Sequence, residues 1–395
     1  MANDNIKSLY LSEICASGFK SIEKLSVDFD KNLNIIIGKN GVGKSNFLEL
    51  LFLSLSNRSL YSNRFLFNEV YYKLVCRENG ETLKVELSRD LDEIIADEKP
   101  FFDRSSIYKT IYLENSEIYN ERKINNENSK YNVFGGLNFR RFLREKGYDF
   151  AGPRYLKYNI PERLEFLNNS GTIRINIERP RILEVPRTLR IFQHIAANVF
   201  RAIHTNNQKG ALIDESKVRK ALQVDEHILL ALRKFTPIQD VRFNSNINIY
   251  SDSKEHIIDN IKLEFFVNNN WYPWSYLSDG TRRLFYLVTE ITDVSNDVIL
   301  IEEPELGVHP HQFHLLMNFI KEESANKQII LSTHSPQSLD HLELDELDKI
   351  IIASYDMEAG TKMRHLDEEE KGKAKEYVQE IGYLSDYWLH SDLES

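Results

Sequence analysis

The chain has 395 residues, 42% of them hydrophobic, which is enough for a large core and for more than one structural unit. Its formal net charge of -10 excludes a protein covered on all sides by nucleic-acid-binding charge. Two cysteines exclude a disulfide framework, and no apolar run approaches the roughly 20 residues of a membrane span. The polar start lacks the order of a secretion signal, so we expect a cytoplasmic protein without a membrane partner.

The first 55 residues have the pattern of three strands, a glycine loop and a helix. Residues 9–16 and 22–29 are typical of strands, and residues 33–37 form a short apolar strand that leads directly into glycines. A helix is expected over residues 45–55, because apolar residues recur there at helical spacing. The order of strand, glycine loop and helix is the one that a phosphate-binding loop requires.

The glycine loop, Gly38-Lys39-Asn40-Gly41-Val42-Gly43-Lys44-Ser45, matches the eight-residue phosphate-binding motif in full. Its glycines let backbone N–H groups turn toward the β- and γ-phosphates, while Lys44 supplies a point charge and Ser45 a hydroxyl for Mg²⁺. We therefore expect ATP and Mg²⁺ as ligands. The expected nucleotide-binding residues of this segment are Gly38, Asn40, Gly41, Gly43, Lys44, Ser45 and Asn46.

The middle of the chain differs in charge from the rest. Residues 138–235 carry 19 lysines and arginines against 10 acids, a net charge of +9, which leaves -19 on the remainder. This asymmetry suggests a partner surface, with DNA or RNA among the candidates.

Elements are also expected before, within and after this basic segment. Before it, residues 70–87 predict a meander with a turn at 78–80, and the polar sequence around 125–132 marks a boundary. Within it, residues 189–203 and 216–234 predict helices, and after it strands are expected again at 243–249 and 261–266.

Two neighbouring acids follow the apolar run Val298 to Ile301. At the exit of a buried strand, the first acid can hold the Mg²⁺ hydration shell and the second can deprotonate the attacking water. We assign Glu302 to the metal and Glu303 to the general base. Further strands at 328–331 and 349–353 and a helix at 311–323 predict an α/β fold with buried parallel strands.

Two shorter motifs flank the acids along the chain. Ser278, Asp279 and Gly280 precede an apolar helix, where the serine can cap the helix and its hydroxyl can address an anion. His334 follows the strand at 328–331, where a histidine can hydrogen-bond the γ-phosphate or the attacking water. Three spaced histidines, His309, His311 and His314, are compatible with zinc, but no cysteine lies near them and zinc is disfavoured.

These four stretches, in this order, resemble the ABC ATPase superfamily, and within it the branch of RecF-like recombination ATPases, chromosome-maintenance ATPases and overcoming-lysogenization-defect (OLD) proteins. Residues 16–23 resemble the strand before the phosphate loop in that branch, and residues 303–305 with 309–310 resemble its D-loop. The resemblance covers about residues 7–57 and 237–355. It departs in its signature, which reads Leu-Ser-Asp-Gly-Thr, and in lacking a recognisable Q-loop glutamine.

The resemblance implies an ATPase whose site is shared between two copies of the chain. Ser278 and Gly280 would close over ATP bound to another copy, and His334 would be the switch histidine beside the catalytic Lys44 and Glu303. We therefore expect a head-to-tail dimer or a higher homo-oligomer. The expected organisation is an N-terminal ATPase lobe over 1–130, a basic and mainly helical insertion over 131–236, and a C-terminal ATPase lobe over 237–395.

Three functions remain open at this point. Only about 60 residues follow His334, so we do not expect the nuclease domain of OLD proteins within this sequence. Compact ATPases such as the Septu ATPase PtuA, which the chain resembles, work with a separate effector in bacterial anti-phage defence. The first function is thus an ATP-gated sensor or scaffold for an effector such as a nuclease. The second is a recombination or repair ATPase that clamps DNA, and the third, a transporter motor, is disfavoured by the signature.

Overall fold

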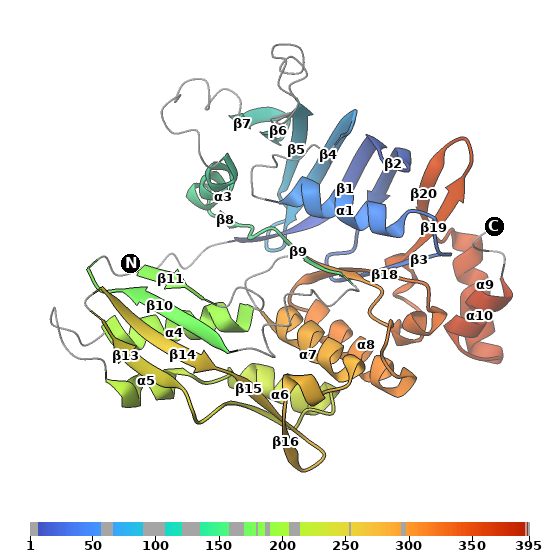
Figure 1. The fold of residues 1–395 in the computed structure, drawn as a ribbon. Helices are drawn as coiled ribbons and strands as arrows, with labels where there is room; N and C mark the ends of the chain where they lie inside the picture. The colour runs from blue at the N-terminus through green and yellow to red at the C-terminus, as the bar shows by residue number, and fades with distance from the viewer. Residues whose placement is uncertain are drawn as a thin grey trace, which may run out of the picture. The chain divides into compact units, whose positions relative to one another are not determined.

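The computed structural model describes most of the chain, and its backbone divides into two units (Figure 1). The described residues are 7–56, 66–89, 107–120, 135–157, 170–178, 181–185, 190–204, 214–252, 254–293, 298–391 and 393. The first unit comprises residues 1–157, 295–304 and 321–395, and the second comprises residues 158–294 and 305–320. We describe each unit by itself.

The first unit is built on one sheet of 13 strands. Its order is β7-β6-β5-β4-β1-β2-β20-β19-β3-β18-β17-β9, and β8 pairs with β1. The strands are β1 (Lys7–Phe19), β2 (Ile22–Asp28), β3 (Leu33–Ile37), β4 (Glu69–Cys76), β5 (Thr82–Arg89), β6 (Ile107–Leu113), β7 (Ser116–Asn120), β8 (Tyr148–Asp149), β9 (Pro153–Leu156), β17 (Val298–Glu302), β18 (Gln328–Thr333), β19 (Ile350–Asp356) and β20 (Gly360–His365). From β7 to β19 the neighbouring strands are antiparallel, and from β19 to β9 they are parallel.

The parallel strands have the sequence of strands that are covered on both faces. Every residue of β3, β17 and β18 is buried, as expected for continuous apolar runs in a parallel sheet. Their neighbour α1 (Lys44–Leu55) buries a row of leucines and Phe47. The other helices of this unit among the described residues are α3 (Gly135–Glu145), α9 (Glu368–Glu380), α10 (Leu384–His390) and the 3₁₀ turns η4 (Pro336–His341) and η5 (Leu347–Lys349).

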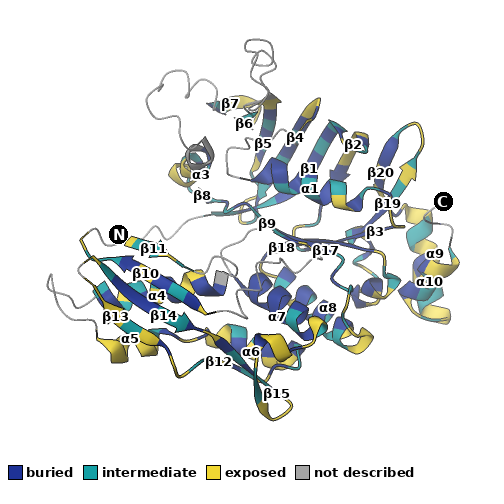
Figure 2. Cartoon of the chain, in the orientation of Figure 1, coloured by how far each residue is buried: buried dark blue, intermediate teal, exposed yellow. Residues whose placement is uncertain are grey.

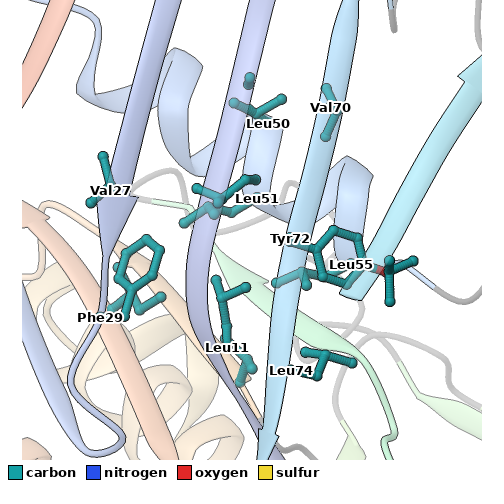
Figure 3. Close-up of a cluster of buried hydrophobic side chains, with 14 of the residues drawn as sticks. Leu11, Val27, Phe29, Leu50, Leu51, Leu55, Val70, Tyr72 and Leu74 are labelled. Carbon is teal, nitrogen blue, oxygen red and sulfur yellow. The ribbon is translucent and has the colours of Figure 1, made fainter. Parts of the chain in front are cut away.

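A hydrophobic cluster joins α1 to the antiparallel half of the sheet (Figure 3). Leu50, Leu51 and Leu55 of the helix lie against side chains from β1, β2 and β4, including Leu11 and Tyr72. Each fully buried aliphatic or aromatic side chain of this kind contributes about 1.5–3 kcal/mol. The cluster therefore holds the helix, and with it the glycine loop at the helix start, firmly on the sheet.

The second unit combines helices with two small antiparallel sheets, and buried residues occur along both its helices and its strands (Figure 2). Its sheets have the orders β11-β10-β14-β13 and β12-β15-β16. The elements are β10 (Gly171–Asn176), β11 (Arg181–Glu184), β12 (Asp240–Phe243), β13 (Asn248–Ser251), β14 (Glu255–Ile261), β15 (Leu263–Val267), β16 (Asn270–Pro273), α4 (Arg190–His204), α5 (Glu215–Ala221), α6 (Glu226–Phe235), η3 (Trp274–Tyr276), α7 (Asp279–Thr292) and α8 (Pro310–Ser324), of which the last runs past the division at residue 320. Phe265 contacts Phe285 of α7 edge to face, with ring centroids 5.0 Å apart, and Phe235 of α6 contacts Phe319 of α8.

The α/β fold class predicted from the sequence is confirmed, and two local predictions need correction. The single strand expected over 243–249 is two strands, β12 and β13, which belong to different sheets. The helix expected over 216–234 is two helices, because Asp225 caps a new helix by accepting a hydrogen bond from the His227 N–H.

The basic segment contributes helices α3 to α6, but also four short strands, and β8 and β9 pair within the sheet of the first unit. The lobe boundaries at 130 and 236 remain a proposal. The expected boundary around 125–132 lies outside the described residues. Within the part of the chain that the structure describes, no helix has the length and apolar character needed to cross a bilayer.

Candidate active site

The glycine loop connects β3 to α1 and leaves no room for side chains at two of its glycines. A Cβ atom on Gly38 would lie 2.2 Å from the Ala353 carbonyl oxygen, and one on Gly43 would lie 2.0 Å from Thr361 Oγ1. Gly43 also has a φ of 102°, in the left-handed region, and stands at the N-cap of α1. The loop therefore requires glycine for space at Gly38 and for both space and backbone conformation at Gly43.

Lys44 is folded back onto the loop that precedes it. Its side chain is only 5% exposed, and Nζ donates hydrogen bonds to the carbonyl oxygens of Gly38 at 2.5 Å and Lys39 at 2.8 Å. Asn40, Gly41 and Ser45 are exposed on the same loop. The ammonium group is thus placed inside the curve of a loop at a helix N-terminus, where an anion is favoured.

Asn46 is tied to residues that the sequence analysis did not single out. Its Nδ2 donates to Ser21 Oγ at 2.8 Å, and Ser21 Oγ lies 2.8 Å from Thr361 Oγ1. Thr361 N in turn donates to the Ser21 carbonyl oxygen at 2.7 Å. Asn46, predicted to bind nucleotide, therefore also anchors the start of α1 to the β1–β2 turn and to β20.

The two acids lie at the carboxyl end of β17. Glu302 is 7% exposed, and its Oε2 accepts a hydrogen bond from the Tyr155 hydroxyl at 3.0 Å. Glu303 follows with a φ of 46°, an uncommon left-handed conformation for a residue with a Cβ atom. Its N–H donates to the Ser332 carbonyl oxygen at 2.8 Å, which holds the turn against β18.

His334 follows β18 and faces the second acid. Its Nδ1 lies 3.7 Å from Glu303 Oε1. The register of the parallel strands explains this proximity, because Ser332 pairs with both Glu302 of β17 and Ile36 of β3, and Thr333 pairs with Ile37. The glycine loop, the two acids and His334 thus follow directly from the carboxyl ends of three adjacent parallel strands, at one edge of the sheet.

The serine-led motif lies in the second unit. Ser278 caps α7, where its Oγ accepts from the Thr281 N–H at 3.2 Å. A Cβ atom on Gly280 would lie 2.8 Å from the Gly307 carbonyl oxygen, so glycine is required there for close packing. Arg282 Nη2 donates to the Ser275 carbonyl oxygen at 2.8 Å and fixes the approach to the helix. The cap predicted from the sequence is present, and its role toward a neighbouring copy remains a proposal.

The chemistry of the expected metal ligands fits Mg²⁺. The Ser45 hydroxyl and the Glu302 carboxylate are hard oxygen donors, which Mg²⁺ prefers, and Mg²⁺ bound with substrate phosphates needs only one or two protein ligands. Among the described residues no group of three or more histidines, cysteines or acids could hold a metal ion. His309 Nδ1 instead accepts from the His311 N–H at 3.3 Å, and His314 Nε2 lies 3.3 Å from Asn318 Nδ2.

The basic segment does not present a set of unpaired cations at its start. Arg141 pairs with Glu145 at 2.8 Å, and Arg140 and Arg144 both approach Asp149, at 3.6 and 2.9 Å. Arg187, another arginine of the basic segment, lies outside the described residues. These ion pairs lie within the basic segment, so its net charge of +9 already takes them into account.

Comparison with known proteins identifies the family. Residues 33–340, which include the glycine loop, the acids and His334, match the family described as "AAA domain, putative AbiEii toxin, Type IV TA system". The chain belongs to this family. It is an ABC-type P-loop ATPase domain of the branch that includes RecF-like, chromosome-maintenance and OLD proteins, as the motifs predicted.

The relatives that match most of this chain share a low sequence identity with it. It is 22% identical over 389 residues to the endonuclease GajA of Bacillus cereus, a match that covers 87% of this chain and 60% of GajA. It is 23% identical over 371 residues to an ATP/GTP phosphatase of Helicobacter pylori, covering 84% and 87% of the two chains. A shorter match, 45% identical over 51 residues, relates it to the DNA replication and repair protein RecF of Lactobacillus acidophilus and covers 13% of this chain and 14% of RecF.

Proposed function

We propose that this protein hydrolyses ATP to ADP and phosphate, with Mg²⁺, at sites completed by a second copy of the chain. The observation that carries the proposal is the arrangement of three strand ends. The glycine loop after β3, His334 after β18 and the acids at the end of β17 follow adjacent parallel strands whose register places them at one edge. These residues supply a loop that can bind phosphate, one carboxylate that can hold the metal and a second carboxylate that can deprotonate the attacking water.

Each residue has a distinct role in the proposed reaction. The backbone N–H groups of the loop and the Lys44 ammonium bind the β- and γ-phosphates, and Lys44 exchanges its bonds to the Gly38 and Lys39 carbonyls for phosphate oxygens. Ser45 and Glu302 hold Mg²⁺, which when bound neutralises charge on the phosphates. Glu303 takes a proton from the attacking water, and His334 contacts the γ-phosphate or that water.

The local geometry supports the assignment of Glu303 as the base. A left-handed backbone at a residue with a Cβ atom costs about 1–2 kcal/mol, and such strain tends to persist at functional sites. Here it places Glu303 Oε1 3.7 Å from His334 Nδ1. Glu302, by contrast, remains buried at the end of its strand, as suits a carboxylate that holds a metal.

The site is proposed to be shared between two protomers. Ser278 and the N-terminal turn of α7 would approach the γ-phosphate held by the loop of the other protomer, so that ATP closes a head-to-tail dimer. The α7 start is suited to an anion, because the first N–H groups of a helix have no acceptor within it and Ser278 already orders the turn. Hydrolysis would remove the shared phosphate and open the dimer.

The biological output proposed here is control of a separate effector, such as a nuclease, in bacterial anti-phage defence. The similarity to the endonuclease GajA supports a link to nucleic-acid cleavage. Residues after His334 form β19 and β20, which lie inside the sheet of the first unit between β2 and β3, and α9 and α10, so they belong to that unit.

Two measurements test this function. Purified protein should release phosphate from ATP in the presence of Mg²⁺, and release at the level of buffer would contradict the enzymatic proposal. A tagged chain, expressed from its native operon, should co-purify with the product of a neighbouring gene. Failure of every neighbouring product to co-purify would contradict the effector proposal and leave the ATPase proposal standing.

A second candidate function, a DNA-clamping repair ATPase, is favoured by the 45% identity to RecF over 51 residues. It predicts ATP-dependent binding of duplex DNA whose affinity falls steeply with salt. Charge reversal at Arg140 and Arg141 should weaken that binding. Binding that survives the reversal unchanged would count against a clamp that uses α3.

A further inference from the structure

Tyr155 contacts the proposed metal carboxylate from a strand that no motif marks. It lies on β9, which pairs in parallel with β17 on the side opposite β18, and Tyr155 is the register partner of Leu300. Its hydroxyl donates to Glu302 Oε2 at 3.0 Å. Tyr155 and Glu302 are 147 residues apart in sequence, so the contact arises only from the pairing of these strands.

The Tyr155 hydroxyl is the donor of this bond, because an ionised carboxylate can only accept hydrogen bonds. A hydrogen bond to an ionised carboxylate is about twice as strong as one between neutral groups.

Packing fixes where that hydroxyl stands. The Tyr155 ring lies against Phe52 of α1, with centroids 5.8 Å apart, and Lys157 Nζ lies 5.1 Å from the Tyr155 ring centroid. Phe52 sits on the helix that begins with Lys44 and Ser45. The same aromatic residue thus touches the helix of the glycine loop and the carboxylate of β17.

We propose that Tyr155 is a positioning residue for Glu302. By holding Oε2, it orients the buried carboxylate toward the metal that this residue shares with Ser45, and it acts on ATP only through Glu302. The inference rests on the proposed ATPase function. This role also explains why β9, a short strand from the basic segment, joins the sheet directly beside the acids. The strand brings the Tyr155 hydroxyl, a fixed hydrogen-bond donor, to the Glu302 carboxylate, whose orientation must be held.

A purely structural role for Tyr155 is the competing explanation, and the chain offers a matched control. Tyr148 of β8, in the same unit, also donates its hydroxyl to a carboxylate, Glu81 Oε2, but it belongs to the strand that pairs with the start of β1. Tyr155→Phe and Tyr148→Phe each remove one hydroxyl from a Tyr–Glu pair and keep the ring. Only the first should alter metal binding.

The experiment measures metal affinity first without turnover and then through activity. In a Glu303→Gln background, Mn²⁺ binding to the ATP complex is followed by electron paramagnetic resonance. In the protein that keeps Glu303, the Mg²⁺ concentration for half-maximal phosphate release is measured. Tyr155→Phe should weaken Mn²⁺ binding and raise the Mg²⁺ half-activation about tenfold, the scale of losing one charge-assisted hydrogen bond. ATP binding in EDTA should stay within twofold, and Tyr148→Phe should change neither metal constant.

A double-substitution cycle keeps the proposal falsifiable if Tyr155→Phe also lowers stability. If Tyr155 acts through Glu302, adding Tyr155→Phe to Glu302→Gln should produce no further loss of Mn²⁺ affinity. Unchanged metal constants in Tyr155→Phe, or an equal loss with and without Glu302→Gln, would overturn the positioning role. Absence of ATP binding and phosphate release in the unsubstituted protein would instead overturn the proposed function itself.

Discussion

Glu303 combines a rare backbone conformation with a central place in the site. Its φ of 46° is maintained by the hydrogen bond from its N–H to the Ser332 carbonyl oxygen, which orders the turn after β17. Because the conformation belongs to the backbone, a glutamine at this position should occupy the same space. The residue can thus be changed chemically with little effect on the fold.

Glu303→Gln should bind ATP within a few-fold of the unsubstituted protein and lose at least about 100-fold in kcat, because the amide cannot accept the water proton. Stopped-flow binding of a fluorescent ATP analogue and phosphate release measure the two effects. The exposed Glu380→Gln is the control and should retain full turnover. Turnover of Glu303→Gln at the control's rate would remove the assignment of the base.

At the level of single residues, the motifs predicted the parts of the site that are contiguous in sequence. The glycine loop, the paired acids and the histidine could be placed because each follows an apolar strand in the sequence. Tyr155, Ser21 and Thr361 could not, because their contacts depend on strand pairing and join residues 147 and 340 positions apart. A tyrosine in the sequence Pro-Arg-Tyr-Leu carries no local sign of the carboxylate that it contacts.

At the level of the elements, the loop between β3 and α1 contains two glycines that are required for different reasons. Gly38 needs glycine for space, since its Cβ would lie 2.2 Å from a backbone oxygen of β19. Gly41 needs it for conformation, since its φ is 84° while no atom lies within 4 Å of a Cβ there. The two substitutions to alanine therefore have different costs.

Gly38→Ala should lower the free energy of unfolding by about 3 kcal/mol or more, because neither backbone segment can move without disturbing the sheet. Gly41→Ala should lower it by only about 1–2 kcal/mol, the cost of a left-handed backbone at alanine. Urea denaturation of the two variants and of the unsubstituted protein gives both changes in the free energy of unfolding. Equal losses for the two variants would show that the loop does not pack against β19 as described.

A half-buried ion-pair cluster links η5 to the end of α8 within the first unit. Glu346 contacts Lys321 at 2.9 Å and Lys349 at 2.6 Å. Burial alone would raise the pKa of Glu346, but the Glu343 N–H and the two ammonium groups outweigh it and lower the pKa from 4.5 to about 2. A lowered pKa in the folded state means that the stabilisation is present above pH 4.5 and is lost as the pH falls toward 2.

Glu346→Gln should therefore reduce stability by on the order of 2 kcal/mol at neutral pH and flatten the decline of stability below about pH 5. Thermal unfolding between pH 7 and pH 3 measures this slope. Glu380→Gln, which changes an exposed glutamate, should leave the slope unchanged. If Glu346→Gln loses the same stability at pH 3 as at pH 7, the cluster does not supply the pH dependence.

The regular elements of the parallel sheet were predictable because burial on both faces demands continuous apolar runs. Short strands such as β9 and β13 were not, since four residues carry too little pattern to identify a strand. The break between α5 and α6 could have been read from Asp225, an N-cap residue that interrupts an otherwise helical segment.

For the whole molecule, the proposed shared site starts from the division of the motifs between the two units. The glycine loop, the acids and His334 belong to the first unit, and the Ser278 cap belongs to the second. In the proposed dimer, each protomer would contribute two kinds of surface, one that holds nucleotide and one that ends in a helix N-terminus. A two-fold dimer in which each surface meets the other kind contains two equivalent sites.

Mixing two inactive variants tests the shared site most directly. Lys44→Ala removes the phosphate charge, and Ser278→Asp keeps the helix cap but sets a negative charge toward the phosphate. A dimer of one variant with the other retains one intact site, formed by the unaltered loop of the Ser278→Asp protomer and the unaltered serine of the Lys44→Ala protomer. Each variant alone should be inactive, and an equimolar mixture should recover about a quarter of the unsubstituted activity. No recovery at any ratio, with both variants folded, or full activity of Ser278→Asp alone, would contradict the account.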